Sequence, residues 1–180
     1  MKKLRYFLQR CYRLTLSAER REEVVWNDLK KLHATAKWNS GVYEKEKHIE
    51  TVFPLCDNKP TSFLYLVQDG NYHCGVTVLA DFPSELTTDI FVLAAHFNNH
   101  LNYGTVTVNA VGQFIEYRFK IPLLLPLLYT GELYRVSIRH YELAKDIYAA
   151  FHRLVDEEEA PAIIIADLLK NVGKREVKKS

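Results

Sequence analysis

The sequence contains little of what disulfide frameworks and zinc knuckles require. It has only three cysteines, Cys11, Cys56 and Cys74, and none of them forms a CxxC pair. An odd number of cysteines without that spacing argues against both kinds of structure. We therefore expect a reducing compartment, the cytoplasm, for this protein.

Long apolar runs are also absent. The longest spans residues 121–129 and contains Pro122 and Pro126, so it is too short and too interrupted to cross a membrane as a helix. Near the N-terminus, Arg5, Arg10 and Arg13 interrupt what would have to be the apolar core of a secretory signal. The sequence therefore predicts neither a membrane span nor a signal peptide.

Glycine-rich loops and a surplus of one charge are missing as well. Only 7 glycines occur, and neither GxGxxG nor a Walker motif is present, so nothing indicates a nucleotide site. A formal net charge of +2 is too small to indicate a nucleic-acid partner. We expect no cofactor and no nucleic acid.

What is present is an ordinary globular composition. Apolar residues make up 48% of the chain and charged residues 26%, and 180 residues suffice for one sizeable core. The expected organisation has three parts: a basic amphipathic helix over residues 1–17, a single α+β domain over 18–172, and a disordered basic tail over 173–180.

Residues 2–16 have the pattern of a basic amphipathic helix. One interpretation is contact with an anionic membrane surface or an acidic partner. The favoured one is packing on its own domain or on a second copy of the chain. One side of this helix carries Leu4, Phe7, Leu8, Cys11 and Leu14, and the rest carries Lys2, Lys3, Arg5, Arg10 and Arg13.

The next segments predict a helix and three strands. Ser17 can cap a helix that ends at 39–41, although residues 2–38 could form one bent helix or two. Period-2 alternation predicts strands over 48–55 and 72–81 around an apolar strand at 63–67. Between the last two, Asp69-Gly70 readily adopts the positive φ values of a hairpin turn.

The second half predicts helix, strand, strand, helix. Ser84 is the expected cap of a helix that ends near 102–104, and strands follow at 106–110 and 115–121. Thr130 is a candidate cap for a long helix that reaches Val155, and Pro161 suits the first turn of a final short helix. The fold class is therefore α+β, with an antiparallel sheet of about five strands packed against helices in the order α-β-β-β-α-β-β-α.

The connector over residues 122–129 is rich in leucine and leaves two alternatives open. It either wraps the core or forms an exposed apolar patch that another chain covers. Its candidate partner-binding residues are Leu123, Leu124, Leu125, Leu127, Leu128 and Tyr129.

Three histidines are the strongest candidates for chemistry. His96 and His100 lie four apart on a predicted helix, a spacing that lets two imidazoles reach one metal ion, but no third ligand is nearby in the sequence. His140 lies on an apolar helical stripe without a nearby nucleophile, so a buried neutral histidine is favoured. An enzyme or metal protein that uses these histidines is the disfavoured hypothesis, and no catalytic, cofactor-binding or metal-binding residue is predicted.

Two other features favour structural roles. Cys74 lies on the inward face of a strand, where a thiol acts as a small apolar group, whereas Cys56 is expected to be more exposed. The acidic run 156–159 lacks the spacing of a calcium loop, so a solvated helix end is expected there.

The segment 88–160 resembles the bacterial YbjN-like family of sensory transduction regulators, and the order of elements looks like the type III secretion chaperone fold. The resemblance lies in the run FNNHLNYG at 97–104 and the strand IEYRFKI at 115–121, followed by a helix that carries Ala144, Tyr148 and Phe151. Candidates for a positional role in the turn into the first strand are Asn98, Asn99, Tyr103 and Gly104, with purely structural bonding as the favoured interpretation.

The resemblance implies a non-enzymatic cytoplasmic protein, and the fold relatives imply dimerisation and binding of extended segments of other proteins. An antiparallel sheet can bind such a segment along its edge. We therefore predict a protein-binding module with a regulatory or chaperone-like role, working as a homodimer with a protein partner of unknown identity. The alternative is a peripheral membrane or acidic-partner binder that acts through the N-terminal basic helix.

Overall fold

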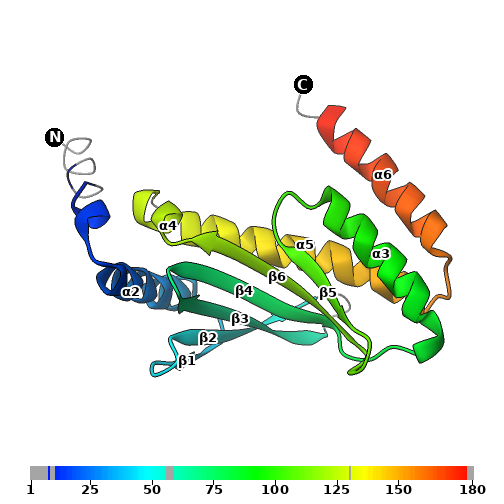
Figure 1. Ribbon diagram of the computed structural model, residues 1–180, viewed down its shortest axis with the longest axis horizontal. Coiled ribbons are helices and arrows are strands. Elements are labelled where there is room, and N and C mark those ends of the chain that lie inside the picture. The colour runs from blue at the N-terminus through cyan, green and yellow to red at the C-terminus, as the bar shows by residue number, and fades with distance from the viewer. Residues whose placement is uncertain (1–7, 9–10, 56–58, 130, 178–180) are drawn as a thin grey trace. The chain divides into compact units, whose positions relative to one another are not determined.

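The computed structural model describes residues 8, 11–55, 59–129 and 131–177. It has the predicted α+β fold class, with a six-stranded antiparallel sheet in the order β1-β2-β3-β4-β6-β5 (Figure 1). The strands are β1 Ser40–Tyr43, β2 His48–Pro54, β3 Pro60–Gln68, β4 Asn71–Leu79, β5 Thr105–Asn109 and β6 Phe114–Pro122. The helices are α2 Ala18–Ala36, the 3-10 turn η1 Ser84–Leu86, α3 Thr87–His100, α4 Leu124–Leu128, α5 Glu132–Val155 and α6 Pro161–Val177.

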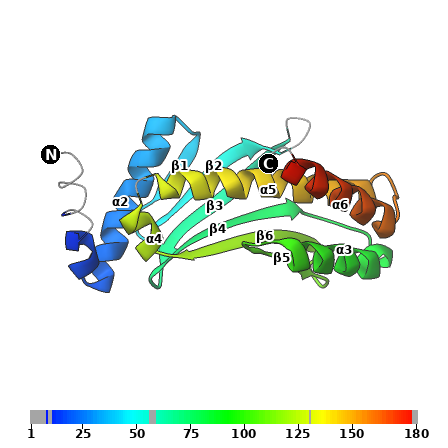
Figure 2. The same cartoon turned by 90° about the horizontal axis from the view of Figure 1, so that it is seen from above.

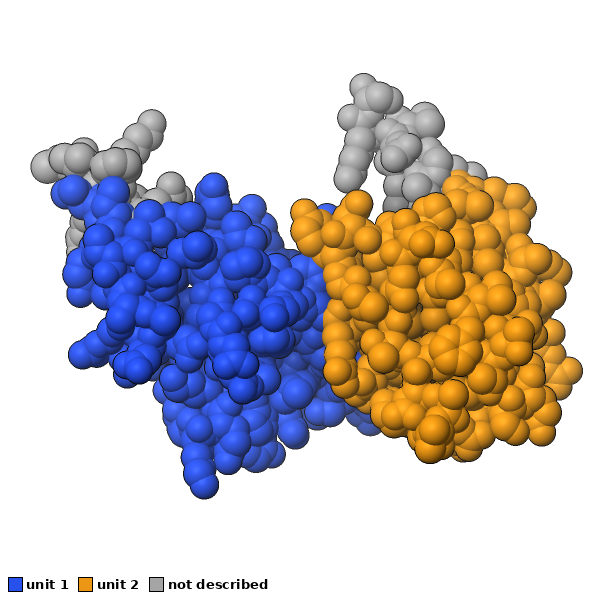
Figure 3. All heavy atoms as spheres, in the orientation of Figure 1, with its two compact units in different colours: residues 1–76, 119–142 blue, residues 77–118, 143–180 orange. Residues whose placement is uncertain are grey.

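The chain divides into two compact units (Figure 3). Unit 1 comprises Met1–Val76 and Phe119–Glu142, and unit 2 comprises Thr77–Arg118 and Leu143–Ser180. Strands β4 and β6 and helix α5 each contribute residues to both units. A single domain over residues 18–172 stays a prediction.

In unit 1, α2 begins as predicted and ends earlier. The Ser17 hydroxyl accepts a hydrogen bond from the Arg20 N–H at 3.4 Å, and the described residues before it are helical up to Thr15, so two helices precede the sheet. Lys37, with φ of 54°, ends α2. The predicted end at 39–41 was wrong because Ser40 and Gly41 belong to β1, which the sequence analysis missed.

The β3–β4 hairpin forms as predicted. Asp69 and Gly70 have φ of 51° and 70°, and Gln68 pairs with Asn71 across the turn. The alternation at 72–81 predicted one buried face for β4, whereas the run at 63–67 was expected to be apolar on both sides and has Leu64 40% exposed. The buried side chains on the shared face of the two strands are Phe63, Tyr65, Val67, Tyr72, Cys74, Val76 and Val78. Helix α2 packs on β3 and also contacts α4 (Figure 2).

In unit 2, the start of α3 differs from the prediction. Pro83 precedes a single 3-10 turn and no side chain caps it, so the expected Ser84 cap was wrong; the tight turn instead brings the Ser84 carbonyl to the Thr87 hydroxyl at 2.7 Å. Helix α3 buries Ile90, Leu93 and Phe97, and α6 runs alongside it (Figures 1 and 2).

Near its two ends, the chain either differs from the prediction or lies outside the described residues. Helix α6 reaches Val177, inside the predicted disordered tail, where Lys174, Arg175 and Glu176 have high helix propensity and Gly173 does not. Residues 178–180, Thr130 and most of the predicted helix 2–16 lie outside the described residues. In the part of the chain that the structure describes, no helix is both long and apolar enough to span a membrane.

Candidate partner-binding surface

The leucine-rich connector folds into α4, and its start is fixed by the β3–β4 turn. The Gly70 N–H donates to a Glu22 carboxylate oxygen at 2.8 Å, and its carbonyl accepts from the Leu123 N–H at 3.0 Å. The hairpin turn therefore links α2 to the first residue of the connector within unit 1.

The connector is partly buried and partly exposed, and its coverage by another chain stays a prediction. Leu123 and Leu127 are each 2% exposed and anchor α4 in the core, because residues four apart share one helix face. Leu128 is half-buried. Leu124, Leu125 and Tyr129 remain 41%, 38% and 49% exposed and form what we call the α4 patch. The candidate residues thus divide into three anchors or partly covered residues and three that a partner could touch.

A hollow of about 340 Å³ lies beside the α4 patch, still within unit 1. Leu32 and Lys31 of α2 line one side, and Leu127, Tyr129 and Tyr134 line the other. Charged residues also line the hollow: Arg13 and Asp28, which form an ion pair at 3.2 Å, and Glu132. An apolar surface beside a hollow with charged residues suits the binding of another protein segment.

Among the candidate residues of the turn after α3, Asn98 bonds local backbone through its side chain. The Asn98 side chain donates to the Val106 carbonyl at 2.9 Å and accepts from the Val106 N–H at 2.8 Å. Strand β5 lies at the edge of the sheet, so no further strand in the described part of the chain bonds the outer backbone groups of Val106. The Asn98 side-chain amide makes the pair of bonds that a neighbouring strand would make. Asn99 is exposed, and the Tyr103 carbonyl accepts from the Tyr117 hydroxyl at 3.1 Å. These contacts hold the α3–β5 junction.

The candidate histidines do not come together as one site. The rings of His96 and His100 lie 4.5 Å apart in unit 2, where partial burial and the neighbouring His100 lower the pKa of His96. His140 belongs to unit 1 and is fully buried with its ring edge-on to Phe63 at 5.7 Å. Among the residues that the structure describes, no group of three or more His, Cys, Asp or Glu side chains could hold a metal ion.

Cys74 also fits packing better than chemistry. Cys74 is 2% exposed, and burial raises the pKa of its thiol to about 12, so it stays protonated at neutral pH. Cys11 is exposed, and Cys56 lies outside the described residues.

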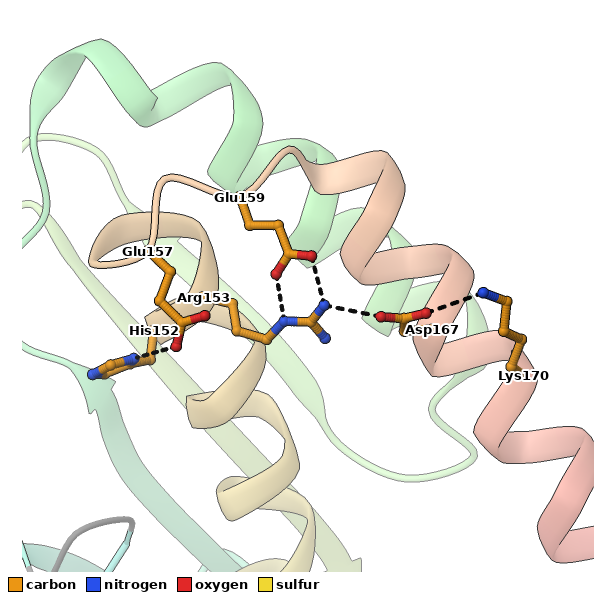
Figure 4. Close-up of polar contacts among 6 residues, drawn as sticks. All are labelled: His152, Arg153, Glu157, Glu159, Asp167 and Lys170. Atoms are coloured by element: carbon orange, nitrogen blue, oxygen red, sulfur yellow. Dashed lines mark hydrogen bonds and ion pairs between the residues drawn. The ribbon is translucent and has the colours of Figure 1, made fainter.

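Sequence reasoning missed two polar clusters. In unit 2, Arg153 binds Glu159 of the predicted solvated run together with Asp167 of α6 (Figure 4). In unit 1, the Nδ1 atom of His33, on α2, lies 2.9 Å from the Ser40 hydroxyl and 3.0 Å from the Thr51 hydroxyl. A separation of six residues does not by itself predict that Arg153 and Glu159 form an ion pair. For His33, the sequence gives one indication of burial: it lies one helical turn beyond Leu29 on the apolar stripe of α2.

Comparison with solved structures finds similarity at the level of the fold. No protein-family model matches this sequence, and no curated protein matches it. The crystal structure of the ExsC–ExsE complex contains a chain with a TM-score of 0.50 and 15% identity, and the match covers 74% of this chain and 94% of that chain. At this identity the similarity shows the fold alone, an α+β architecture like that of type III secretion chaperones.

Proposed function

We propose that this protein is a non-enzymatic, cytoplasmic protein-binding module with a chaperone-like or regulatory role, and that it acts as a homodimer. The observation that carries the proposal is the α4 patch, in which Leu124, Leu125 and Tyr129 are exposed and Tyr129 also lines the hollow. Exposed apolar side chains in one contiguous segment are costly to keep in water unless a partner covers them.

The fold is consistent with this proposal. The similar solved chain comes from a complex of two named proteins, ExsC and ExsE. A shared fold carries architecture better than function, so the binding role here rests on the patch. Membership of the YbjN-like family stays a prediction from the residues at 97–104 and 115–121.

The test places charge on the patch. In the double variant Leu124→Asp, Leu125→Asp, two carboxylates would have to be desolvated on binding. We expect recovery of cross-linked partner from cells that express the tagged chain at matched levels to fall at least tenfold, which is about 1.4 kcal/mol of binding free energy. Quantitative mass spectrometry of the co-purified proteins measures it.

Val111→Asp is the matched control, because Val111 is 98% exposed in the β5–β6 turn of unit 2. It should retain the partner at the wild-type level. Undiminished recovery with the double variant contradicts the proposal for the α4 patch. Sedimentation velocity tests the dimer, for which a mass twice the 21.0 kDa of the chain is expected and a strict monomer counts against it.

A second candidate is binding to an anionic membrane surface or an acidic partner through helix 2–16. Leu8, Tyr12 and Leu14 are 58%, 66% and 40% exposed, so the described part of this helix presents apolar side chains to solvent. Under this function the chain floats with phosphatidylserine vesicles at low salt, and the variant Leu8→Asp, Leu14→Asp stays at the bottom of the gradient. Equal recovery of both forms removes this candidate.

A further inference from the structure

Within unit 2, one arginine of α5 links the turn before α6 to α6 itself. The Arg153 guanidinium donates to both carboxylate oxygens of Glu159, at 2.6 and 2.8 Å, and to Asp167 of α6 at 3.0 Å (Figure 4). Lys170 donates to the other oxygen of Asp167 at 3.2 Å. Two-pronged arginine–carboxylate pairs are among the stronger polar contacts, but the Asp167 side chain is 41% exposed, so water and salt weaken the part that reaches α6.

The apolar contacts beneath α6 are incomplete. Ile164 is fully buried, whereas Ile163 and Leu169 are 53% and 49% exposed. A hollow of about 340 Å³ remains between α3, α5 and α6, with Leu168 and Leu169 of α6 on one side. Protein interiors are normally packed to crystal-like density, and unfilled space forfeits attractive contacts. Helix α6 therefore leaves part of the space between α3 and α5 unfilled.

The walls of the groove combine apolar side chains with the polar groups of His96, His100, Asp146 and Arg153. The apolar lining consists of Phe97 of α3, Leu101 directly after α3, and Leu143 and Ile147 of α5. Arg153 lines the groove near the end of α5. On α6, Ile164 enters the core and Asp167 reaches Arg153 three residues later, which places both on one helical side. The groove thus matches an apolar residue followed three positions on by a carboxylate.

We propose that α6 is a displaceable internal occupant, and that the groove between α3 and α5 binds an amphipathic helix of a partner protein with this same pattern. The inference rests on the proposed protein-binding function and adds the chemistry of the partner. A partner carboxylate replaces Asp167 on Arg153, so the exchange never leaves the guanidinium without an anion. Larger apolar side chains on the partner would fill the hollow that α6 leaves.

The direct test uses the protein's own helix as the probe. A fluorescent peptide with residues 161–177 is titrated into the full-length chain and into the full-length variant Ile164→Ala, Asp167→Asn. The substitutions loosen α6 and leave every groove residue of α3 and α5 unchanged. We expect the peptide to bind this variant at least tenfold more tightly than the wild type, by fluorescence anisotropy. Adding Arg153→Ala should weaken that binding at least tenfold.

Ile163→Ala is the matched control, because it makes the same change at an exposed position of α6, and it should bind the peptide as weakly as the wild type. Equal affinity of wild type and loosened variant overturns the proposal, as does binding that ignores Arg153→Ala. Concentration-dependent dimers of the loosened variant that exclude the peptide also overturn it, since the occupant would then be α6 of a second copy. These experiments do not test binding at the α4 patch, so their failure would leave the proposed function standing.

Hydrogen exchange of the unmodified wild-type chain gives a readout that needs no variant. Local opening exchanges the amides of a loosely held element faster than those of the core. Amides at 164–170 should exchange at least tenfold faster than those at 90–97 of α3. Equal protection of the two segments overturns the proposal that α6 is displaceable.

Discussion

Gly104→Ala should lower the free energy of unfolding by about 4 kcal/mol, near the upper end of what single substitutions do. Gly104 has φ of 82°, a left-handed conformation that side chains rarely adopt. A Cβ there would lie 2.7 Å from the Arg118 carbonyl oxygen and 2.6 Å from Cε2 of Tyr117. Neither neighbour can yield easily, because one is the backbone of β6 and the other is a ring that is 0% exposed.

Substitutions at two other glycines separate the cost of the positive φ from the cost of the steric clash. Gly131 has φ of 83° but no atom within 4 Å of an added Cβ, so Gly131→Ala should cost only the backbone term, about 1 kcal/mol. Gly75, in β4, also has nothing within 4 Å, and it does not share the positive φ, so Gly75→Ala should change stability by less than about 1 kcal/mol.

Urea denaturation of the three variants, followed by circular dichroism, measures the series. The expected order of destabilisation is Gly104, then Gly131, then Gly75. A Gly104→Ala variant that loses no more stability than Gly131→Ala contradicts the close approach of α3–β5 junction and β6. The same result would remove the reason for glycine at the end of the run FNNHLNYG.

The strands could be predicted where one face is buried and the other is not. Residues 48–55 and 72–81 contain buried side chains in alternation, and that period is readable in the sequence. The strand at 63–67 was predicted from a run that is apolar at every position, so its buried face could not be read in advance. Strand β1 has only four residues, of which three are exposed, so its sequence carries no such period. Short edge strands are held by their neighbour's backbone, here that of β2, and not by their own apolar pattern.

The candidate surface was predictable as a segment but not as a face. Leucine content marks residues 123–128 as apolar, and only the helical turn of α4 decides that Leu123 and Leu127 point inward while Leu124 and Leu125 do not. The Arg153 cluster could not be predicted, because it depends on the turn at 156–160. Glu158 takes a left-handed φ of 52° there and brings the chain back toward α5.

Acid should destabilise this protein through one buried histidine. His33 is 2% exposed, and its Nδ1 atom lies 2.9 Å from the Ser40 hydroxyl and 3.0 Å from that of Thr51. The two hydroxyls are 2.9 Å apart, so the three groups form a closed triangle. The ring stands edge-on to Trp38 at 4.8 Å and to Tyr65 at 5.2 Å. Burial lowers the pKa of His33 from 6.5 to about 4.

The direction of the effect follows from where the proton binds. Below pH 6.5 the unfolded chain protonates His33, whereas the folded chain resists protonation until about pH 4. Stability from the neutral ring is therefore complete above pH 6.5 and is lost progressively as the pH falls from 6.5 to 4. At about 1.4 kcal/mol per pKa unit, the full loss is about 3 kcal/mol.

His33→Asn isolates this contribution, because the amide keeps a polar atom near the position of Nδ1 and does not titrate. The free energy of unfolding is measured by urea denaturation at pH 7 and pH 4 for both proteins. The variant is expected to be less stable at pH 7, since the ring packs on Trp38 and Tyr65. Its loss of stability between the two pH values should be smaller than that of the wild type by about 3 kcal/mol. Parallel pH dependence in the two proteins would mean that the imidazole reaches water or a compensating anion, contrary to the closed triangle.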